Sequence, residues 1–516
     1  MRRRNAINTF KQSLLNKEAF SVTWELVPGR GAHEQQQEEL IAAAQQAAKD
    51  DKVHAIAITD NAGGNPALSA TYLGLELLKL GVEPLVHFAC KDKNRNQIEA
   101  ELYAMDRAGI NNLLVLTGDY PVKGFQGRPR PVFDLDSVQA LEMVSRMNQG
   151  FAIPGPKAAT HNQPADFFAG AVVSPFKATE AELLTQYYKL RKKIAHGAAF
   201  IITQVGYDAR KFHEVLQMVR SIDPHTAVIG NIYILPFGAA KMMNANQLPG
   251  CVVPDRLLDQ LDEERAAADK GKSARLLRAA KMYALLKGMG FDGVHLGGHN
   301  VKYDDITYII EQGEALSADW RQLVPEFDFP QPGSFYYYEK DAATGLNTAQ
   351  PADRAALPSE LPVGFNYRLM RLLHHLFFTP GQKLYPFMQR RYAAKKDLRK
   401  YRLEHRLKVM GNDCRDCGDC ALMDLAYLCP MSQCPKNQRN GPCGGSYHGW
   451  CEVYPDQKCI WVKAYARLKA YNEENRLQDL YLPPVNWDLN QTSAWYNYYT
   501  GRDHSAGSDG GTVREH

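Results

Sequence analysis

The sequence predicts an α/β protein, a (β/α)8 barrel followed by a small cysteine-rich metal-binding domain. Two observations carry this prediction. Over residues 1–312, short apolar runs rich in β-branched residues alternate with longer segments of helical period, which is typical of a parallel sheet. Eight of the ten cysteines then fall within residues 414–459. Eight strands in about 280 residues fit a (β/α)8 barrel, and a doubly wound open sheet is the alternative.

The expected strands are Phe20–Val27, Val53–Thr59, Glu83–Phe88, Asn112–Thr117, Phe167–Val173, Ala199–Gln204, Val228–Leu235 and Gly293–Gly297. The clearest helical patterns between them are Glu34–Lys49, Ala67–Leu80, Gln97–Ala108, Glu180–His196 and Lys272–Met289. None of the strands leads into a G-x-G-x-x-G sequence, so the usual dinucleotide fingerprint is missing.

The composition sets limits on partners and location. A net charge of +4 over 516 residues is nearly neutral and gives no reason to expect a nucleic-acid or membrane partner. No run of about 18 apolar residues is present, so no transmembrane helix is expected. No apolar segment follows the basic N-terminus, so no secretory signal is visible and we expect a cytoplasmic protein.

In a barrel of this kind, chemistry takes place where the strands end, at the C-terminal face. Six strand ends there carry polar residues, namely Glu25, Thr59, His87, the Thr117-Gly118-Asp119 sequence, Gln204 and the segment His295–Asn300. Each has an ordinary structural explanation, such as an ion pair for the glutamate, a helix cap for the aspartate or a satisfied core position for the histidine and glutamine. Their shared position on one rim favours a functional site.

The cysteine segment contains C-R-D-C-G-D-C followed by five further cysteines. Two-residue gaps let thiolates converge on one inorganic centre. An iron–sulfur domain with one or two clusters is our first interpretation, a zinc site the second, and disulfides the third, because no secretion signal is visible. The candidate metal ligands are Cys414, Cys417, Cys420, Cys429, Cys434, Cys443, Cys451 and Cys459.

Several segments in residues 15–312 resemble the methylenetetrahydrofolate reductase family, flavin-dependent barrels that reduce 5,10-methylenetetrahydrofolate to 5-methyltetrahydrofolate. They are T-W-E-L-V-P around Glu25, I-T-D-N after the second strand, V-H-F-A-C in the third, L-T-G-D-Y-P after the fourth, and the lysine-bearing helix with its glutamine-ending strand, residues 189–204. The cysteine segment resembles the small partner subunit of this reductase in acetogenic bacteria, where it is linked to iron–sulfur or zinc binding.

The resemblance implies a role for each matching residue. Glu25 would be the general acid that protonates N10 of the folate, and burial would raise its pKa towards neutrality. Asp119 would lie beside the pterin and the flavin pyrimidine edge, and Gln204 would hydrogen-bond the pterin. The expected flavin contacts are Thr59, His87, Thr117, Gly118, Asp119 and Lys193, with Lys193 neutralising a phosphate.

Three departures from the family pattern leave FAD and FMN both open. Val301 stands where an arginine follows the eighth strand in familiar members, and Thr117 stands where an arginine is common. Residues 121–165 form a long stretch rich in proline, glycine and arginine where the family has a short loop. The changes concern the folate tail and the far end of the flavin.

The rest of the chain divides into three parts. Residues 313–365 are expected to form a proline- and aromatic-rich linker packed on the barrel, residues 366–500 a helical and cysteine-rich domain, and residues 501–516 a disordered tail. Residues 389–408 carry nine lysines and arginines against two acids, which indicates a solvated helix face, a docking surface for an acidic electron carrier, or nucleic-acid binding, in that order.

The expected function is methylenetetrahydrofolate reduction in one-carbon and methionine metabolism, with folate as the substrate and homo-oligomers possible. The electron donor is either NAD(P)H or a ferredoxin-like partner. The alternatives are a non-catalytic electron-transfer scaffold, or the same reductase run in the methyl-oxidising direction.

Overall fold

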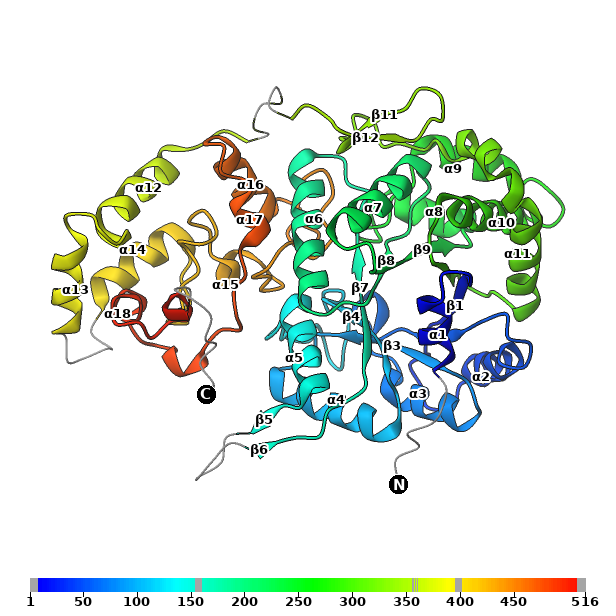
Figure 1. Ribbon diagram of the computed structural model, residues 1–516, viewed down its shortest axis with the longest axis horizontal. Coiled ribbons are helices and arrows are strands. Elements are labelled where there is room, and N and C mark those ends of the chain that lie inside the picture. The colour runs from blue at the N-terminus through cyan, green and yellow to red at the C-terminus, as the bar shows by residue number, and fades with distance from the viewer. Residues whose placement is uncertain are drawn as a thin grey trace.

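The barrel is closed and entirely parallel in the computed structural model, which describes residues 8–153, 160–354, 357, 359, 361–394 and 401–507 (Figure 1). Its strands are β1 (Ser21–Leu26), β2 (Ala55–Ile58), β3 (Pro84–Ala89), β4 (Asn112–Leu116), β7 (Phe168–Val173), β8 (Phe200–Thr203), β9 (Ala227–Tyr233) and β10 (Gly293–Gly297). Their order around the barrel is β1-β10-β9-β8-β7-β4-β3-β2, closed by β2 on β1. The predicted barrel with its eight strands is confirmed, and the open sheet is excluded.

Helices surround the barrel. They are α2 (Gln35–Ala47), α3 (Ala70–Lys79), α4 (Arg95–Ala108), α5 (Ser137–Gln149), α6 (Glu180–Ala195), α7 (Ala209–Ile222), α8 (Phe237–Asn244), α9 (Asp255–Glu264), α10 (Lys272–Met289) and α11 (Tyr303–Leu316), with the short turn η1 (Ala62–Gly64) after β2. Strand residues that point outwards, such as Trp24 and Leu26, pack into the layer between strands and helices.

A separate apolar cluster fills the interior of the barrel. Helix α1 (Thr9–Leu15) lies at the N-terminal end of the strands and places the fully buried Phe10 there. The Phe10 ring meets Phe200 at 5.3 Å and Phe168 at 6.0 Å between centroids, both edge-on. Because this end is packed with side chains, any site must lie at the opposite, C-terminal end.

The stretch 121–165 contains a helix that the sequence analysis did not predict. Asp136 accepts hydrogen bonds from the amides of Val138 and Gln139, and the Gln139 side chain accepts one from the Asp136 amide, which forms a capping box at the start of α5. The short strands β5 (Ala152–Ile153) and β6 (Thr160–His161) follow. The long proline-rich segment before Asp136 indicated a loop, so the helix cap was not recognised. Part of residues 121–165 is therefore a regular helix of the barrel.

Residues 313–354 contain ordered structure that contacts the barrel helices. The 3-10 segment η2 (Ser317–Phe327) precedes a two-stranded sheet of β11 (Tyr338–Lys340) and β12 (Asn347–Pro351). Arg210 of α7 donates to the Asn347 side chain at 2.7 Å and to the Tyr338 carbonyl at 2.7 Å. These bonds tie the sheet to α7.

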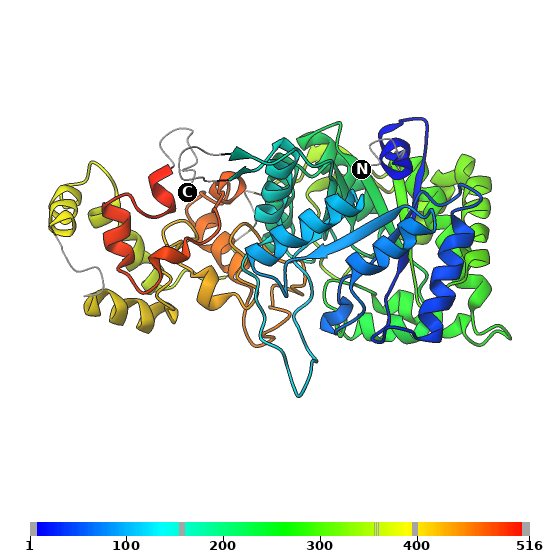
Figure 2. The same cartoon turned by 90° about the horizontal axis from the view of Figure 1, so that it is seen from below.

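The C-terminal region lies beside the barrel, next to α5 and α6 (Figures 1 and 2). Its elements are α12 (Phe365–Phe378), α13 (Tyr385–Ala393), α14 (Arg402–Asn412), α15 (Pro430–Gln433), α16 (Ile460–Lys469), α17 (Arg476–Asp479), η3 (Trp487–Leu489), α18 (Ala494–Tyr499) and η4 (His504–Gly507). Tyr465 of α16 donates to Glu180 of α6 at 2.8 Å, with both side chains buried.

The expected disordered tail is wrong for residues 501–507. His504 lies at the start of η4 with its side chain buried, and its Nδ1 lies 2.5 Å from Asp419 Oδ1. Residues 508–516 lie outside the described residues. Among the helices that the structure describes, none has both the length and the apolar character needed to cross a membrane.

Candidate functional site

Glu25 points into the barrel at the C-terminal end of β1. Side chains alternate along a strand, and Trp24 and Leu26 pack outwards, so Thr23 and Glu25 face inwards. The Glu25 side chain remains 21% exposed. The barrel wall therefore holds this side chain, and part of it is exposed at the mouth.

Two histidines surround this carboxyl group. His295 on β10 places Nε2 3.4 Å from Glu25 Oε2, while its Nδ1 lies 2.8 Å from the Thr23 hydroxyl. His87 on β3 completes the group, because ligand atoms of all three side chains lie within 4.8 Å of one another. The sequence identified His295 only as part of a strand end. The alternation of side chains along β10 points His295 into the barrel, and this could have indicated that it lies near Glu25.

The pKa of Glu25 is lowered, contrary to the sequence-based expectation. Withdrawal from water by itself would raise this pKa, but the hydrogen bond and the electrostatic interaction with His295 outweigh it. Burial lowers the pKa of His87 to about 4, so this imidazole is neutral at physiological pH. The sequence analysis missed the effect because the decisive partner lies 270 residues away.

Unpaired polar atoms mark the wall next to this group. Within the described part of the chain, His87 Nε2 and Thr59 Oγ1 are buried without a hydrogen-bond partner. Such atoms carry a free-energy cost unless a ligand or water satisfies them. Both residues are expected flavin contacts, and their free donor and acceptor atoms fit the polar edge of a flavin ring.

The loop after β4 carries Asp119, which is exposed. Its Oδ2 accepts a hydrogen bond of 2.7 Å from the Gly63 amide, which fixes the carboxylate at the rim. Gly118 has a φ of 89°, and a Cβ there would lie 2.8 Å from the Lys91 side chain. This turn therefore requires glycine.

Two expected flavin contacts meet the C-terminal region. The Thr117 hydroxyl donates to Gln438 Oε1 at 3.1 Å, and the Gly118 carbonyl accepts from Lys436 Nζ at 2.9 Å. The cysteine-rich region therefore covers part of the barrel rim at β4. Sequence reasoning treated the two parts separately and did not identify Lys436 or Gln438.

Gln204 lies directly after β8, at the expected position on the rim. Its Oε1 accepts from the Val205 amide at 2.8 Å. A Cβ on Gly250 would lie 3.3 Å from Gln204 Nε2 and 3.1 Å from the Gly444 carbonyl. Three distant segments thus meet at the candidate pterin contact, and one of them belongs to the cysteine-rich region.

Lys193 is buried on α6 and its Nζ donates to the Val172 carbonyl at 2.6 Å. Burial and the neighbouring Lys189 lower its pKa to about 7. A bound phosphate would favour its charged form, and the phosphate role expected for Lys193 stays a prediction.

The eight clustered cysteines divide into two sets of four, and none of the ten cysteines of the chain forms a disulfide. We call them the outer and inner quartets. One small cavity is lined by the outer quartet, which consists of Cys414, Cys417, Cys420 and Cys429. Another is lined by the inner quartet, which consists of Cys434, Cys443, Cys451 and Cys459. Four thiolates around one cavity fit a zinc ion or a four-iron cluster.

The inner quartet is the one joined to the barrel. Lys436, two residues after Cys434, pairs with Glu452 and donates to Gly118 at the rim. Lys177 donates to the carbonyls of Gly444 and Ser446, just beyond Cys443. The segment that carries the inner quartet is therefore fixed directly to the candidate site.

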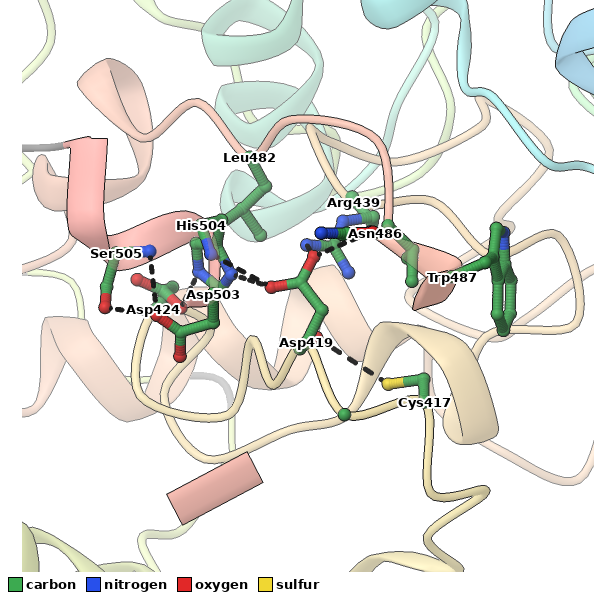
Figure 3. Close-up of polar contacts among 12 residues, drawn as sticks. Cys417, Asp419, Asp424, Arg439, Leu482, Asn486, Trp487, Asp503, His504 and Ser505 are labelled. Atoms are coloured by element: carbon green, nitrogen blue, oxygen red, sulfur yellow. Dashed lines mark hydrogen bonds and ion pairs between the residues drawn. The ribbon is translucent and has the colours of Figure 1, made fainter. Parts of the chain in front are cut away.

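A buried polar network lies next to the outer quartet (Figure 3). Asp419, between Cys417 and Cys420 in the sequence, lies between His504 and Arg439, whose guanidinium is 3.6 Å away. Arg439 is only 2% exposed, and none of its three side-chain nitrogens has a hydrogen-bond partner in the described residues. A buried cation with free donors beside thiol groups fits a centre that carries negative charge.

The fold and these groups define a class, a (β/α)8 barrel with a polar site at its C-terminal face and a thiol-rich region against the rim. The sequence profile of the methylenetetrahydrofolate reductase family matches residues 10–312, and that of a domain described as "Methylene-tetrahydrofolate reductase C terminal" matches residues 393–488. The chain belongs to the methylenetetrahydrofolate reductase family.

Individual relatives are distant. "Methylenetetrahydrofolate reductase 2" of Schizosaccharomyces pombe is 23% identical over 322 residues, which cover 60% of this chain and 47% of that protein. The chain thus spans about half the length of this relative.

Two solved structures are distantly similar to part of this chain. An uncharacterised Clostridium thermocellum protein that binds two copies of 5-methyl-5,6,7,8-tetrahydrofolic acid has a TM-score of 0.41 at 14% identity, covering 60% of this chain and 99% of that one. Yersinia pestis DHPS with a pterine-sulfa conjugate has a TM-score of 0.34 at 11% identity, covering 58% and 96%.

Proposed function

We propose that the barrel interconverts 5,10-methylenetetrahydrofolate and 5-methyltetrahydrofolate, with reduction as the forward direction. Reduction consumes two electrons and two protons, because the ring opens by cleavage of the N10–methylene bond, hydride adds to the methylene carbon and N10 gains a proton. The observation that carries the proposal is the convergence of Glu25, His295 and His87 beside the unpaired Thr59 hydroxyl in a barrel of this family. A bound flavin would supply the hydride.

Each rim residue has a distinct part. Glu25 exchanges a proton with folate N10, and His295 orients its carboxyl group. Asp119 holds a negative charge at the rim, which disfavours extra negative charge on a nearby reduced cofactor. Gln204 presents an amide to the pterin ring.

The lowered pKa of Glu25 supports the methyl-oxidising direction as a second candidate. A carboxyl group of low pKa is mostly ionised at neutral pH, and the ionised form is the one that removes a proton from N10–H. In the reductive direction the same group acts as a strong acid that is seldom protonated. The two directions therefore predict opposite pH dependences for the folate half-reaction.

A bound flavin, FMN or FAD, would be held by Thr59, His87, Thr117, Gly118 and Asp119, and Lys193 would neutralise its phosphate. Each cysteine quartet would hold one iron–sulfur cluster or one zinc ion. An iron–sulfur centre would supply one-electron chemistry, whereas zinc would only stabilise the fold. Electrons would then come from a ferredoxin-like partner or from NAD(P)H, respectively.

Metal analysis of matched cysteine variants tests the two-centre arrangement. Protein purified without oxygen is compared with Cys417→Ser, Cys443→Ser and, as a control, Cys90→Ser in the barrel wall. Each quartet variant is expected to lose about half of the bound metal, while the control keeps all of it. Full metal content in both quartet variants would contradict the assignment.

Chemical reduction tests the enzymatic proposal against a non-catalytic scaffold. Flavin-loaded protein reduced with dithionite is mixed with methylenetetrahydrofolate, and 5-methyltetrahydrofolate is quantified. Formation of product dismisses the scaffold. Protein that holds reduced flavin but yields no product would contradict the proposed function.

A further inference from the structure

Helices α12, α13 and α14 expose an unusual number of large apolar side chains. Met410 is 86% exposed, Phe365 78%, Leu403 69% and Phe387 61%. Others with more than a third of their surface exposed are Leu369, Leu372, Leu373, Leu376, Leu384, Leu407 and Val409. The three helices form the end of the molecule farthest from the barrel (Figures 1 and 2). We call the exposed side of these helices the terminal face.

Among the described residues of α12, α13 and α14, the exposed charges have one sign. The exposed cations of the terminal face are Arg368, Lys383, Arg390, Arg391, Arg402 and Arg406. Glu404 is the only carboxylate in the three helices; it is 4% exposed and binds Lys408 and Ser493 in the interior. A partner that approaches the terminal face therefore meets apolar surface framed by positive charge.

Helix α14 connects the terminal face to the outer quartet. Its buried side, with Glu404, Lys408 and Asn412, lines the same cavity as the outer quartet. Its opposite side exposes Leu403, Arg406 and Met410. The helix ends at Asn412, two residues before Cys414. A protein bound on the terminal face thus lies one helix diameter from a thiolate site, about 10 Å.

The positive charge of the terminal face and its position beside the outer quartet indicate which kind of partner binds there. A purely solvated face does not need this much apolar surface. A second copy of the chain in a two-fold arrangement would bring like charges together, which is unfavourable. An acidic protein has the complementary charge, and the adjacent thiolate site fits a redox centre.

We propose that the terminal face is the docking surface for an acidic one-electron carrier protein. This inference rests on the proposed function, since two such carriers would supply the two electrons that reduction of the methylene group requires. The carrier is oxidised in the exchange, and the two protons come from solvent.

Binding measurements test the proposal without turnover. The probe is an acidic ferredoxin with four-iron clusters, titrated against the full-length protein at low and high salt. The variant R390E/R391E/R402E/R406E reverses four charges on the terminal face. The control K49E/K79E/K241E/K340E reverses four exposed charges on the barrel and its appended sheet. A second variant, F387S/M410S, removes apolar contacts and leaves the charge unchanged.

We expect the terminal-face variant to bind ferredoxin about tenfold more weakly or worse, with a smaller salt dependence. The control is expected to stay within about twofold of the parent, and F387S/M410S to bind more weakly at both salt concentrations. Equal weakening by both charge variants, or no binding by the parent protein, would overturn the proposal. So would tighter binding to phosphatidylserine vesicles than to ferredoxin, or self-association that only the terminal-face variant abolishes.

Dithionite-driven folate reduction separates the two proposals. It bypasses the carrier, so the terminal-face variant should match the parent protein in this assay. Absence of product from the parent protein would refute the proposed function. The docking proposal is tested separately, by the ferredoxin titration.

Discussion

Replacing Glu25 by glutamine separates proton transfer from the other functions of the site. Glutamine has nearly the same shape and can keep the contact that joins Oε2 to His295 Nε2 at 3.4 Å. It cannot exchange a proton at neutral pH. The side chain is 21% exposed and lies at the barrel mouth, away from the Phe10 cluster, so the fold should be unaffected.

The expected loss follows from the role of the carboxyl group. General acid–base catalysis contributes about 10²–10⁴-fold, equal to about 2.7–5.4 kcal/mol of barrier. We expect E25Q to lose activity of this order in the folate half-reaction, measured by stopped-flow oxidation of reduced flavin. Reduction of the flavin by dithionite should remain within about twofold. Equal losses in both half-reactions would refute the assigned role.

The pH profile gives a second check on the same residue. The folded pKa of Glu25 lies below its ordinary value, so the acid form decreases about tenfold per pH unit above that pKa. Folate reduction by the free enzyme should therefore slow as the pH rises from 5 to 8, and oxidation of the methyl group should not. E25Q should lose the slope. A slope that persists in E25Q would show that another group donates the proton.

Three further predictions concern charge, burial and packing. Asp119→Asn removes a negative charge from the rim, so potentiometry should show a more positive flavin potential and folate reduction should slow about tenfold, the order expected for one charge near a surface; an unchanged potential would contradict this. Lys193 has a pKa of about 7 when folded, so the unfolded chain binds more protons between pH 7 and about 10.4 and stability should rise with pH across that window. Lys193→Met should reduce this rise, to which the buried Lys192 also contributes, and stabilise the cofactor-free protein at pH 7 by up to about 4 kcal/mol in urea unfolding; parallel stability curves would argue against the assignment. Phe10→Ala should cost about 3–5 kcal/mol by the same method, and a loss below about 1 kcal/mol would mean that the ring does not support the barrel core.

The barrel was predictable because local signals determine it. Each strand is a short apolar run bounded by turn residues. Because side chains alternate along a strand and parallel strands all end at the same face of the barrel, the positions of Glu25 and Gln204 at strand ends place them on the rim. Helix α5 escaped prediction because its capping signal at Asp136 follows a long proline-rich segment. The sequence at Asp136 contains a helix-capping pattern, but the proline-rich composition of the preceding residues indicated a loop.

The chemistry of the site depends on contacts between distant segments. The direction of the Glu25 pKa shift is set by His295, and no property of the β1 sequence contains that information. The division of eight cysteines into two quartets likewise requires the folded chain, because four ligands can be chosen in many ways from a sequence. The contact of Gln438 with Thr117 joins two segments 321 residues apart.

The C-terminal region is held to the barrel by charged groups placed in the interior. Lys189 donates to Gln438 and to the carbonyls of Gly441 and Pro442, and Asp136 accepts from the amides of Arg439 and Asn440. Buried charges of this kind favour one relative placement, because a shifted interface would leave them unpaired. The cap of α5 and the inner-quartet segment thus share one carboxylate.

A single turnover of the reduced protein tests the proposed folate reduction most directly. Flavin-loaded protein, reduced without oxygen and freed of excess reductant, is mixed with 5,10-methylenetetrahydrofolate while flavin absorbance and folate products are followed together. We expect one 5-methyltetrahydrofolate to form for each flavin oxidised, rapidly in the parent protein and only slowly in E25Q. Flavin oxidation without methyl product, or protein that binds no flavin, would contradict it.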